Sequence, residues 1–397
     1  MSVSVISTSM KDQLSHYQVA NIPLSVYIHY PWCIKKCPYC DFNSHILTNR
    51  VQINEQDYLD ALIKDLEQQL PSVWGRRIHS IFIGGGTPNL LSPRAIKSLL
   101  NHLRALLPLL PEAEITMEAN PGVHEKSHLQ AYRDAGVTRL SIGVQSLNQY
   151  MLSRLGRIHS PKQAYAMIED ALSIFPEVNA DLMYGLPAQT VALAQQDIKQ
   201  LIALGLTHIS AYQLTLEPNT LFYTKTPTLP HEETLMAIEA IVHSHLFKAG
   251  FHRYEISAFA KDKHVCLHNL NYWRFGDYLG LGAGAHGKIT LPQEIQRTHH
   301  RKNPYDYIQH IACGKKPYST PVLSKDIPGE FMMNALRLLD GFTIALYEER
   351  SGLPWMKIVS QIDIAEQRGL LQRVAWQTVA PTSLGSQFLN ELIEIFF

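Results

Sequence analysis

Two features are scarce in this sequence: long apolar runs, and an excess of charge of either sign. No apolar run approaches the roughly 18 residues of a membrane-spanning helix. The first 22 residues are polar and irregular, unlike a secretory leader. Lys and Arg together number 35, as do Asp and Glu, so no net charge attracts the chain to nucleic acid or anionic lipid. These absences predict a cytoplasmic globular protein without a nucleic-acid partner.

Cysteine is also scarce, and the five that occur are an odd number, which argues for a reducing compartment rather than a disulfide framework. Cys33, Cys37 and Cys40 are spaced C-x3-C-x2-C, while Cys266 and Cys313 lie far downstream. A closed zinc site needs four ligands, and an iron–sulfur cube is normally held by four thiolates. Three thiolates would leave one iron without a protein ligand. The cluster of cysteines therefore predicts a metal centre with an open position, where reactants bind.

The residues around the cysteines make this pattern more specific. Residues 26–33 are predicted to form a strand that leads into the cluster, and Tyr39 and Phe42 supply aromatic cover. The motif resembles that of the radical S-adenosylmethionine (SAM) superfamily, in which an aromatic residue precedes the last cysteine. The resemblance implies a [4Fe–4S] cluster on the three thiolates, with SAM on the fourth iron. It also implies an electron donor such as flavodoxin or ferredoxin, and release of a 5′-deoxyadenosyl radical on SAM cleavage.

Strand and helix patterns alternate along the first 250 residues. Alternation of this kind implies a parallel sheet whose carboxyl ends carry the functional residues. We therefore expect an α/β fold, and the resemblance implies a partial (β/α)6 barrel, because two further units for an eight-fold barrel are not evident. The predicted strands are residues 24–29, 78–83, 114–119, 140–144, 178–182 and 208–215.

Several helix boundaries are marked by their residue types. Asn54 is a predicted N-cap, and Ser92 is another, followed by proline in the first turn. Ser160 and Gln163 form a predicted capping box, again with proline at the first helical position. Gly250 is expected to end a helix over residues 231–249.

Glycines and polar residues lie at or just past the predicted strand ends. Gly84-Gly-Gly-Thr-Pro88 is neither a Walker loop nor a dinucleotide fingerprint, and its glycines would let a ligand approach the backbone closely. From about residue 24 to the C-terminus the chain resembles the oxygen-independent coproporphyrinogen oxidase-like family. The resemblance assigns SAM binding to Tyr27, Gly85, Gly86, Thr87, Pro88, Glu118, Gln145, Arg157 and Asp181. A carboxylate can hold ribose hydroxyls or the SAM ammonium, and an arginine can pair with the methionine carboxylate.

Two departures distinguish branches within that family. Phe42 stands where the dehydrogenase branch has a further cysteine, and residues 268–273 read H-N-x-x-Y-W, which resembles a motif of the haem chaperone branch. A neutral imidazole can ligate haem iron, and aromatic rings offer an apolar surface to a porphyrin face. We predict that His268 is the main contact to haem iron and that Tyr272 and Trp273 form part of the porphyrin-facing wall. Asn269 completes the predicted haem-binding set; the competing interpretation of the motif is a structural turn.

A second glycine-rich stretch follows this motif. Residues 282–287 match G-x-G-x-x-G formally, but Lys288-Ile-Thr-Leu-Pro reads as strand rather than helix, which excludes a dinucleotide site. A glycine-rich strand end here could line the same cavity as the haem motif. His286 is a second candidate ligand, and His299 and His300 follow it.

The chain length of 397 residues suggests one large and one small domain. We expect an irregular arm over 1–23, the barrel over 24–250, a connecting segment over 251–304 that holds the glycine-rich and H-N-x-x-Y-W stretches, and a C-terminal domain over 305–397.

The C-terminal domain is predicted to be winged-helix-like. It would have helices over 327–339, 343–351, 355–367 and 383–396, and a hairpin of 370–374 with 377–380. From Thr320 to Phe397 there are 6 Lys/Arg against 9 Asp/Glu, a net charge of −3, which disfavours DNA binding. A cover for the barrel mouth or a protein-docking surface is favoured instead. The apolar tail from Leu392 is expected to pack back onto the chain; the alternative is peripheral membrane contact during haem transfer.

Together these patterns predict a haem chaperone that binds haem and passes it to an acceptor protein, with a [4Fe–4S] cluster and exchangeable SAM. The alternative is an oxygen-independent coproporphyrinogen III dehydrogenase, which decarboxylates two propionates through the 5′-deoxyadenosyl radical. A third reading is another radical reaction on a tetrapyrrole, such as methyl transfer or ring cleavage. Coproporphyrinogen dehydrogenase activity is not expected, because Phe42 replaces the cysteine of that branch.

Overall fold

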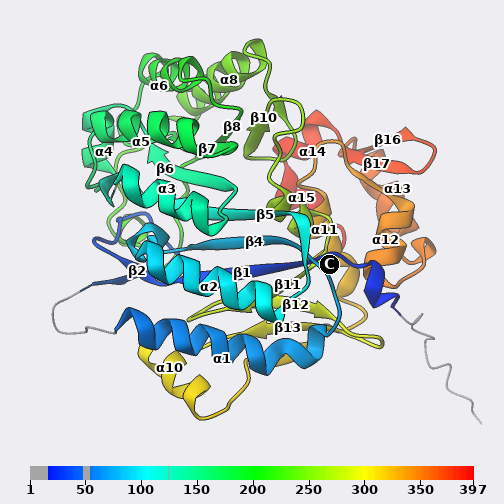
Figure 1. Cartoon of the computed structure of the whole chain (residues 1–397). Helices are drawn as coiled ribbons and strands as arrows, with labels where there is room; N and C mark the ends of the chain where they lie inside the picture. Colours follow the sequence, from blue (N-terminus) through cyan, green and yellow to red (C-terminus); the bar gives the residue numbers. More distant parts are fainter. Residues whose placement is uncertain (1–16, 48–53, 124) are drawn as a thin grey trace, which may run out of the picture.

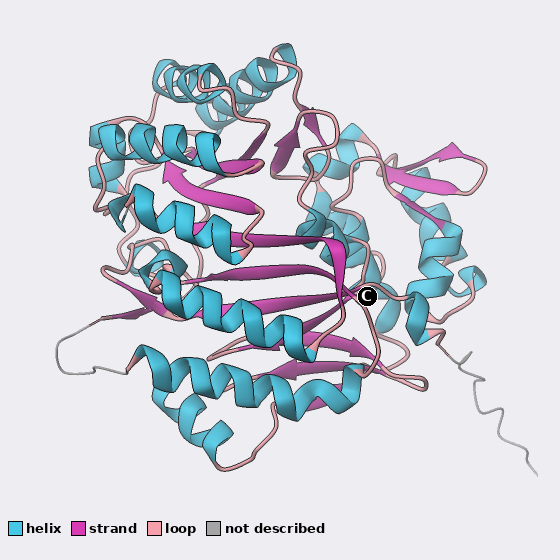
Figure 2. Cartoon of the chain, viewed as in Figure 1, coloured by secondary structure: helices cyan, strands magenta, loops and turns pink. Residues whose placement is uncertain are grey.

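The protein, described here by a computed structural model over residues 17–47, 54–123 and 125–397, is built around one sheet. The strand order is β14-β13-β12-β11-β1-β4-β5-β6-β7-β8-β10-β9. Helices α1, α2, α3 and α5 cover one side of this sheet, and a smaller domain lies beside it (Figure 1). The alternation of helix and strand along the chain is evident in Figure 2 and confirms the expected α/β class.

The centre of the sheet is parallel. Each of the six strands predicted from the sequence is present, and β5 begins earlier than expected because its first residues pair with the start of β4. Parallel pairing aligns the carboxyl ends of the strands along one edge of the sheet. The six are β1 (Leu24–Tyr30), β4 (Ile78–Gly85), β5 (Leu109–Ala119), β6 (Arg139–Gln145), β7 (Glu177–Tyr184) and β8 (His208–Gln213).

Four helices begin or end where the sequence places a cap. Asn54 accepts a hydrogen bond from the Gln56 N–H, and Ser92 accepts one from the Ala95 N–H. At Ser160 both bonds of the predicted capping box with Gln163 are present. The helices of this part are α1 (Glu55–Val73), α2 (Pro93–Leu106), α3 (Lys126–Ala135), α4 (Gln149–Arg154), α5 (Pro161–Ile174), α6 (Val191–Ala203), α7 (Leu221–Thr224) and α8 (Glu232–Lys248), the last followed by Gly250 in a left-handed conformation.

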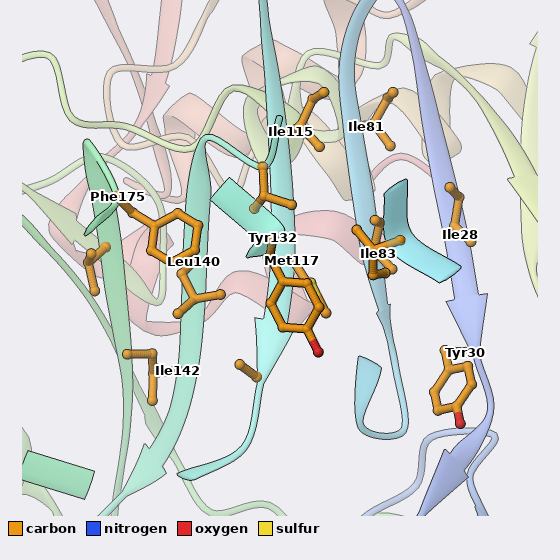
Figure 3. Packing of buried hydrophobic residues seen from close by; sticks show 14 of the residues in the cluster. Ile28, Tyr30, Ile81, Ile83, Ile115, Met117, Tyr132, Leu140, Ile142 and Phe175 are labelled. Carbon is orange, nitrogen blue, oxygen red and sulfur yellow. The ribbon is translucent and has the colours of Figure 1, made fainter. Parts of the chain in front are cut away.

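The main core lies between the parallel strands and the outer helices. Buried side chains such as Ile83, Met117 and Ile142 come from neighbouring strands and pack together with Tyr132 of α3 and Phe175 beyond α5 (Figure 3). Each apolar side chain removed from water contributes about 1.5–3 kcal/mol. The alternate apolar positions of each strand are therefore what holds the helices against the sheet.

The sheet extends past the strands that the sequence analysis identified. β11 (Asp277–Leu281) pairs in parallel with β1, and β12 (His286–Thr290), β13 (Ile295–His299) and β14 (Tyr318–Pro321) continue from it in antiparallel fashion. At the other end, β10 (Ala258–Ala260) and β9 (His252–Arg253) are also antiparallel. Only β12 corresponds to an expected strand. The rest are short, and they form because long-range pairing satisfies their backbone groups.

The glycine-rich stretch 282–287 is a tightly packed turn between β11 and β12. Gly282 has φ +104°, and a Cβ there would lie 2.5 Å from the His29 carbonyl oxygen. The exclusion of a dinucleotide fingerprint is confirmed, since the segment opens onto strand β12 rather than a helix. Close backbone packing, not a phosphate, accounts for these glycines.

The C-terminal domain has its own core, in which Phe331, Tyr347 and Ile362 are buried. Leu392 and Phe396 join it, so the prediction that the tail packs back onto the chain is confirmed. The single helix expected over residues 383–396 is wrong, because the backbone at Phe388 leaves the helical conformation and divides it. The helix α10 (Pro304–Ala312) packs on α1 and belongs to the main core. The elements of the C-terminal domain are α11 (Ile327–Ala335), β15 (Phe342–Thr343), α12 (Ile344–Ser351), α13 (Val359–Gln367), β16 (Leu371–Ala375), β17 (Thr378–Pro381), α14 (Ser383–Gln387) and α15 (Leu389–Glu394).

Within the described part of the chain, no helix combines the length and the apolarity that a membrane crossing would require.

Candidate functional site

The cysteine loop follows β1 at the carboxyl edge of the sheet. Cys33 ends β2 (Trp32–Cys33), which pairs with β3 (His45–Ile46), and Cys37 and Cys40 lie in the turn between them. All three thiols line one cavity of about 530 Å³. Cys266 is buried against Glu114 and Cys313 is exposed after α10, so neither shares this cavity. The three cysteines that are close in sequence therefore lie together at one cavity, and the other two cysteines lie elsewhere.

Three thiols that line one cavity are a donor set that an iron–sulfur cube can use. In the described ranges, no three His, Cys, Asp or Glu side chains lie close enough together to hold one metal ion. In an iron–sulfur cube each thiolate binds a different iron, so the sulfurs are spread around the cube. Burial raises the pKa of the Cys33 and Cys40 thiols, against a hydrogen bond from Ser44 that lowers both. A bound metal cation would favour the thiolate form.

The glycine loop after β4 is pressed against the cysteine loop. The Gly86 N–H donates to the Tyr30 carbonyl at 2.7 Å, and the Thr87 N–H donates to the Trp32 carbonyl at 2.8 Å. A Cβ on Gly86 would lie 2.5 Å from the Trp32 carbonyl oxygen and 3.0 Å from the Cys33 Sγ. The glycine is thus required by the approach of the two loops. Gly85, Gly86, Thr87 and Pro88 all line the cavity beside the thiols.

Two buried carboxyl groups face the same cavity from β5 and β7. Glu118 accepts a hydrogen bond from the Gly85 N–H at 3.0 Å, and Asp181 accepts one from the Asn179 amide at 2.8 Å. Burial, and then the charge of Asp181, raises the pKa of Glu118 to about 8. Burial also raises the pKa of Asp181 to about 6, against its hydrogen bonds. Groups held partly protonated at neutral pH can either donate to or accept from ribose hydroxyls.

Arg157 and Gln145 complete this wall. Arg157 donates to the Gly143 carbonyl at 2.6 Å and lies 3.8 Å from the Cys37 Sγ, while its buried Nε has no partner among the described residues. Gln145 ends β6 with φ +66°, and its side chain accepts a hydrogen bond from Tyr212. An unpaired guanidinium N–H beside the cysteine loop fits a ligand carboxylate.

The SAM-binding positions predicted from the sequence therefore converge, with one exception. Tyr27 does not line the cavity; its hydroxyl is hydrogen-bonded to the His29 ring at 2.9 Å, and its own ring stacks on Phe82. The remaining eight predicted positions all do.

The H-N-x-x-Y-W motif forms a helix, α9 (Leu267–Trp273), rather than a loop. Residues four apart lie on the same helix face, so the motif divides into two pairs. Asn269 and Trp273 line the cavity that holds the cysteines. His268 and Tyr272 do not, because that face packs against β4. One motif thus contributes a cavity wall and a packed helix face at once.

His268 is buried, and both its ring nitrogens are occupied. Nδ1 lies 2.9 Å from the Ser80 hydroxyl and Nε2 lies 2.8 Å from the Tyr272 hydroxyl, with the Phe82 ring beside them. Burial lowers the pKa of His268 to about 3, so the imidazole is neutral. A neutral ring is the form that ligates iron, but here it is not in the cavity wall. His286, His299 and His300 do not line the cavity either.

Sequence reasoning missed the residues that close the cavity on the side of α9. They are Glu255 and Ser257, near β9 and β10, and Arg337 from the C-terminal domain. Arg337 also borders a second cavity of about 680 Å³ that runs between β8 and α14–α15. No motif marks these residues. Pairing of their segment with β8 places Glu255 and Ser257, and docking of the C-terminal domain on the barrel brings Arg337 to the site.

Sequence profiles of known families match both the barrel and the C-terminal domain. A sequence profile described as the radical SAM superfamily matches residues 27–201, and one described as the HemN C-terminal domain matches residues 322–375. The "Heme chaperone HemW" of Escherichia coli K12 is 46% identical over 378 residues, covering 94% of this chain and 98% of that protein. The protein of the same name in Haemophilus influenzae is 45% identical over 383 residues, with the same coverage.

Solved structures agree on the fold. A structure described as coproporphyrinogen III oxidase (HemN) from Escherichia coli, a radical SAM enzyme, superimposes with a TM-score of 0.80 over 96% of this chain and 91% of that chain. Its sequence identity is 23%, so the likeness extends to the fold and not to the activity.

Proposed function

The chain belongs to the heme chaperone HemW family of radical SAM proteins, and we propose that it binds haem and passes it to an acceptor protein. The observation that carries this proposal is the shared cavity of about 530 Å³, which the three thiols, Asn269 and Trp273 all line. Ligand cavities are typically about 300–1,000 Å³, and the volume of this cavity falls in that range. Its wall combines apolar side chains with charged ones of both signs.

The residues beside the cysteine loop are suited to hold the group that the family implies. Cys33, Cys37 and Cys40 would hold a [4Fe–4S] cluster, which when bound supplies the electron that cleaves the SAM sulfonium bond. Arg157 would pair with the methionine carboxylate through its free Nε. Glu118 and Asp181 would bind hydroxyl or ammonium groups, and the glycine loop would follow the ligand closely.

An electron donor would approach the cysteine loop from solvent. Lys35 and Lys36 are exposed between the cysteines, which favours a small acidic carrier such as flavodoxin or ferredoxin. Neutralising both lysines should slow reduction of the cluster mainly at low salt. Equal rates in the parent and the Lys35→Gln/Lys36→Gln variant would argue against this surface.

Haem delivery would involve an acceptor protein. Transient contact of the apolar tail with a membrane is the further possibility to be tested. Phe397, at the end of the chain, is 73% exposed although Phe396 beside it is buried. Co-sedimentation of haem-loaded protein with anionic and neutral vesicles tests membrane contact, with Phe397→Ser as the comparison.

The function is tested by haem titration of anaerobic, cluster-reconstituted protein, followed by mixing with candidate apo-acceptors. We expect saturable haem binding and a haem spectrum that moves to the acceptor. Incubation with coproporphyrinogen III, SAM and reductant should yield no protoporphyrinogen at the ~1–1000 turnovers per second typical of enzymes. Product formation at such rates would replace the chaperone with the dehydrogenase alternative.

We propose His268 as the iron ligand, which requires its ring to exchange Ser80 or Tyr272 for iron. His268→Ala should shift the Soret band and weaken haem binding while leaving the iron–sulfur spectrum intact. Trp273→Ala should weaken haem binding without altering the ligand signature. His286→Ala, at the start of β12 and outside the cavity wall, is the matched control. Unchanged spectra in His268→Ala would move the ligand to His286, His299 or His300.

A further inference from the structure

Arg337 is the residue through which the C-terminal domain reaches the barrel cavity. It lies in the turn after α11, and the next residue, Leu338, forms an antiparallel bridge with Glu255. The Leu339 N–H also donates to the Tyr254 carbonyl. These backbone contacts hold Arg337 in the cavity wall, which it shares with Glu255 and Trp273.

Three chain segments meet around the guanidinium. The Arg337 Cζ lies 4.3 Å from the centre of the Trp273 ring, and Trp273 ends α9. Glu255, from the segment between β9 and β10, is 4% exposed and lies beside the guanidinium. A cation stacked on an indole keeps its edge free for hydrogen bonds in the ring plane.

In the part of the chain that the structure describes, hydrogen-bonding groups of Arg337, Glu255 and Trp273 remain unsatisfied. The Arg337–Glu255 separation is 3.7 Å, too long for a hydrogen bond. The Arg337 Nε, the Glu255 Oε2 and the Trp273 Nε1 are all buried, and none has a hydrogen-bond partner within the described ranges. Burial raises the pKa of Glu255 and lowers that of Arg337, against the attraction between them.

A purely structural ion pair between the two domains would look different, and the chain contains one for comparison. Arg297 of β13 donates to Glu330 of α11 at 2.9 Å and 2.6 Å, from Nε and one terminal nitrogen. The Arg297 side chain is 29% exposed, the same as that of Arg337. Arg297 does not line the cavity and Arg337 does, so a contact between the domains does not by itself account for the long separation at Arg337.

We propose that Arg337 and the Trp273 Nε1–H form a subsite for a ligand carboxylate, which a propionate of haem occupies. This assignment rests on the proposed function. A guanidinium presents five N–H donors, so Arg337 can bind the propionate through Nε and a terminal nitrogen while it still faces Glu255. The indole N–H supplies a third donor, and the Trp273 ring offers apolar surface to the porphyrin.

The carboxylate of SAM is the other source of the same chemistry. Arg157 lies beside the cysteine loop, within 3.8 Å of the Cys37 Sγ, and has a free Nε of its own. Arg337 is set instead beside Trp273 of the H-N-x-x-Y-W helix. The structure thus provides two arginines whose Nε has no hydrogen-bond partner among the described residues, one at the thiols and one at α9.

The test compares Arg337→Gln with Arg297→Gln, an equally exposed arginine outside the cavity, in cluster-reconstituted full-length protein. Each is titrated with haem and with haem dimethyl ester, in which both propionates are blocked. We expect Arg337→Gln to weaken haem binding by about tenfold or more, the loss that corresponds to one charge-assisted hydrogen bond. Arg297→Gln should bind haem as the parent does. The ester should bind the parent and Arg337→Gln equally.

Equal haem affinity of the parent and Arg337→Gln would overturn the subsite while leaving haem binding intact. The subsite would also be overturned if Arg337→Gln lost affinity for haem and for haem dimethyl ester by the same factor. Weakened SAM binding with unchanged haem affinity would assign the carboxylate to SAM and also overturn it. Absence of haem binding by the parent would overturn the proposed function itself, and the propionate assignment with it.

Trp273→Phe removes only the indole donor and keeps an aromatic ring. This substitution should weaken the binding of haem more than the binding of haem dimethyl ester. An equal loss of affinity for both ligands would count against the subsite. Melting temperature and iron content measure folding of each variant independently, and Arg337→Lys, which keeps the charge, should recover part of the lost affinity.

Discussion

At the scale of single residues, the site is shaped by close backbone approach as much as by polar groups. Gly86 is the clearest case, because the Trp32 carbonyl and the Cys33 Sγ occupy the space where its Cβ would be. The same crowding sets the position of a cluster ligand relative to the glycine loop.

Gly86→Ala should therefore lower the iron content after reconstitution and destabilise the protein by about 1–3 kcal/mol, the usual cost of overpacking. Gly205→Ala is the control: its φ of +82° makes it strained, but no atom of the described residues lies within 4 Å of the added Cβ. That variant should lose stability and keep its iron. Full iron content in Gly86→Ala would contradict the role of this contact.

Each of Cys33, Cys37 and Cys40 should be needed for the cluster. Replacing any of them by alanine should abolish the iron–sulfur absorbance and the bound iron after anaerobic reconstitution, because each thiolate binds a separate iron. Cys266→Ala and Cys313→Ala are the controls and should retain iron. Loss of the cluster in Cys266→Ala, with retention in Cys37→Ala, would reverse the assignment.

His159 should make the protein sensitive to acid. Burial, and then the charge of Arg157, lowers its pKa to about 4, below the unfolded value of about 6.5. The folded state then binds fewer protons, so the free energy of unfolding falls as the pH drops from about 6.5 toward 4. His159→Gln lacks this proton uptake on unfolding, so its deficit in stability relative to the parent should shrink by about 1.4 kcal/mol per pH unit. Urea unfolding of cluster-free protein at about pH 7, 6 and 5 measures this; a constant deficit would contradict it.

At the scale of elements, some helices are specified by local caps and others are held by tertiary contacts. The capping box of α5 and the Ser92 cap of α2 are local, and both are present where the sequence predicts them. Helix α9 is the opposite case: it is short, contains two asparagines, and is held by contacts such as Asn271 to Ser25 and to the Asp277 carbonyl. Its helical spacing is what places His268 on the packed face and Trp273 in the cavity wall.

The capping box can be tested within one helix. Ser160→Ala removes the acceptor for the Gln163 N–H and should cost about 0.5–2 kcal/mol in the free energy of unfolding. Ser173→Ala, in the last turn of the same helix, is the control: that hydroxyl only donates to the Asp170 carbonyl and is exposed, so its loss should cost under about 0.5 kcal/mol. Chemical denaturation compares the two, and equal costs would mean that the cap contributes nothing.

At the scale of the whole molecule, the smaller domain completes the cavity of the larger one, and its charge does not favour nucleic acid. The hairpin of β16 and β17 carries Arg373, which is paired with Glu366 and Asp363. Binding to nucleic acid depends on cations free to neutralise phosphates.

We accordingly expect no binding of a labelled DNA duplex at physiological salt, measured by fluorescence anisotropy. Binding that weakens steeply with added salt would show a phosphate-neutralising surface and contradict this expectation. Glu366→Gln, which frees Arg373, is the comparison that would show whether pairing or the overall charge balance is decisive.

The sequence by itself determined the six central strands, four helix ends, the set of three cysteines and most of the residues of the proposed SAM-binding wall. These features depend on local pattern: alternating apolar residues, caps within one turn, and residues that follow parallel strands and so meet at one edge. Tertiary structure decided the outer strands β11, β13 and β14, which lack a clear pattern of their own and form by pairing with distant segments.

Tertiary structure also decided how α9 faces the cavity and which residues close it. Arg337 and Glu255 are 82 positions apart in the sequence, and backbone contacts such as the bridge between Glu255 and Leu338 bring them together. No local pattern carries information about a contact of that separation, because it depends on the docking of one folded domain on another. The sequence therefore identified most of the residues of the candidate site, and the packing of two domains determined which other residues close its cavity.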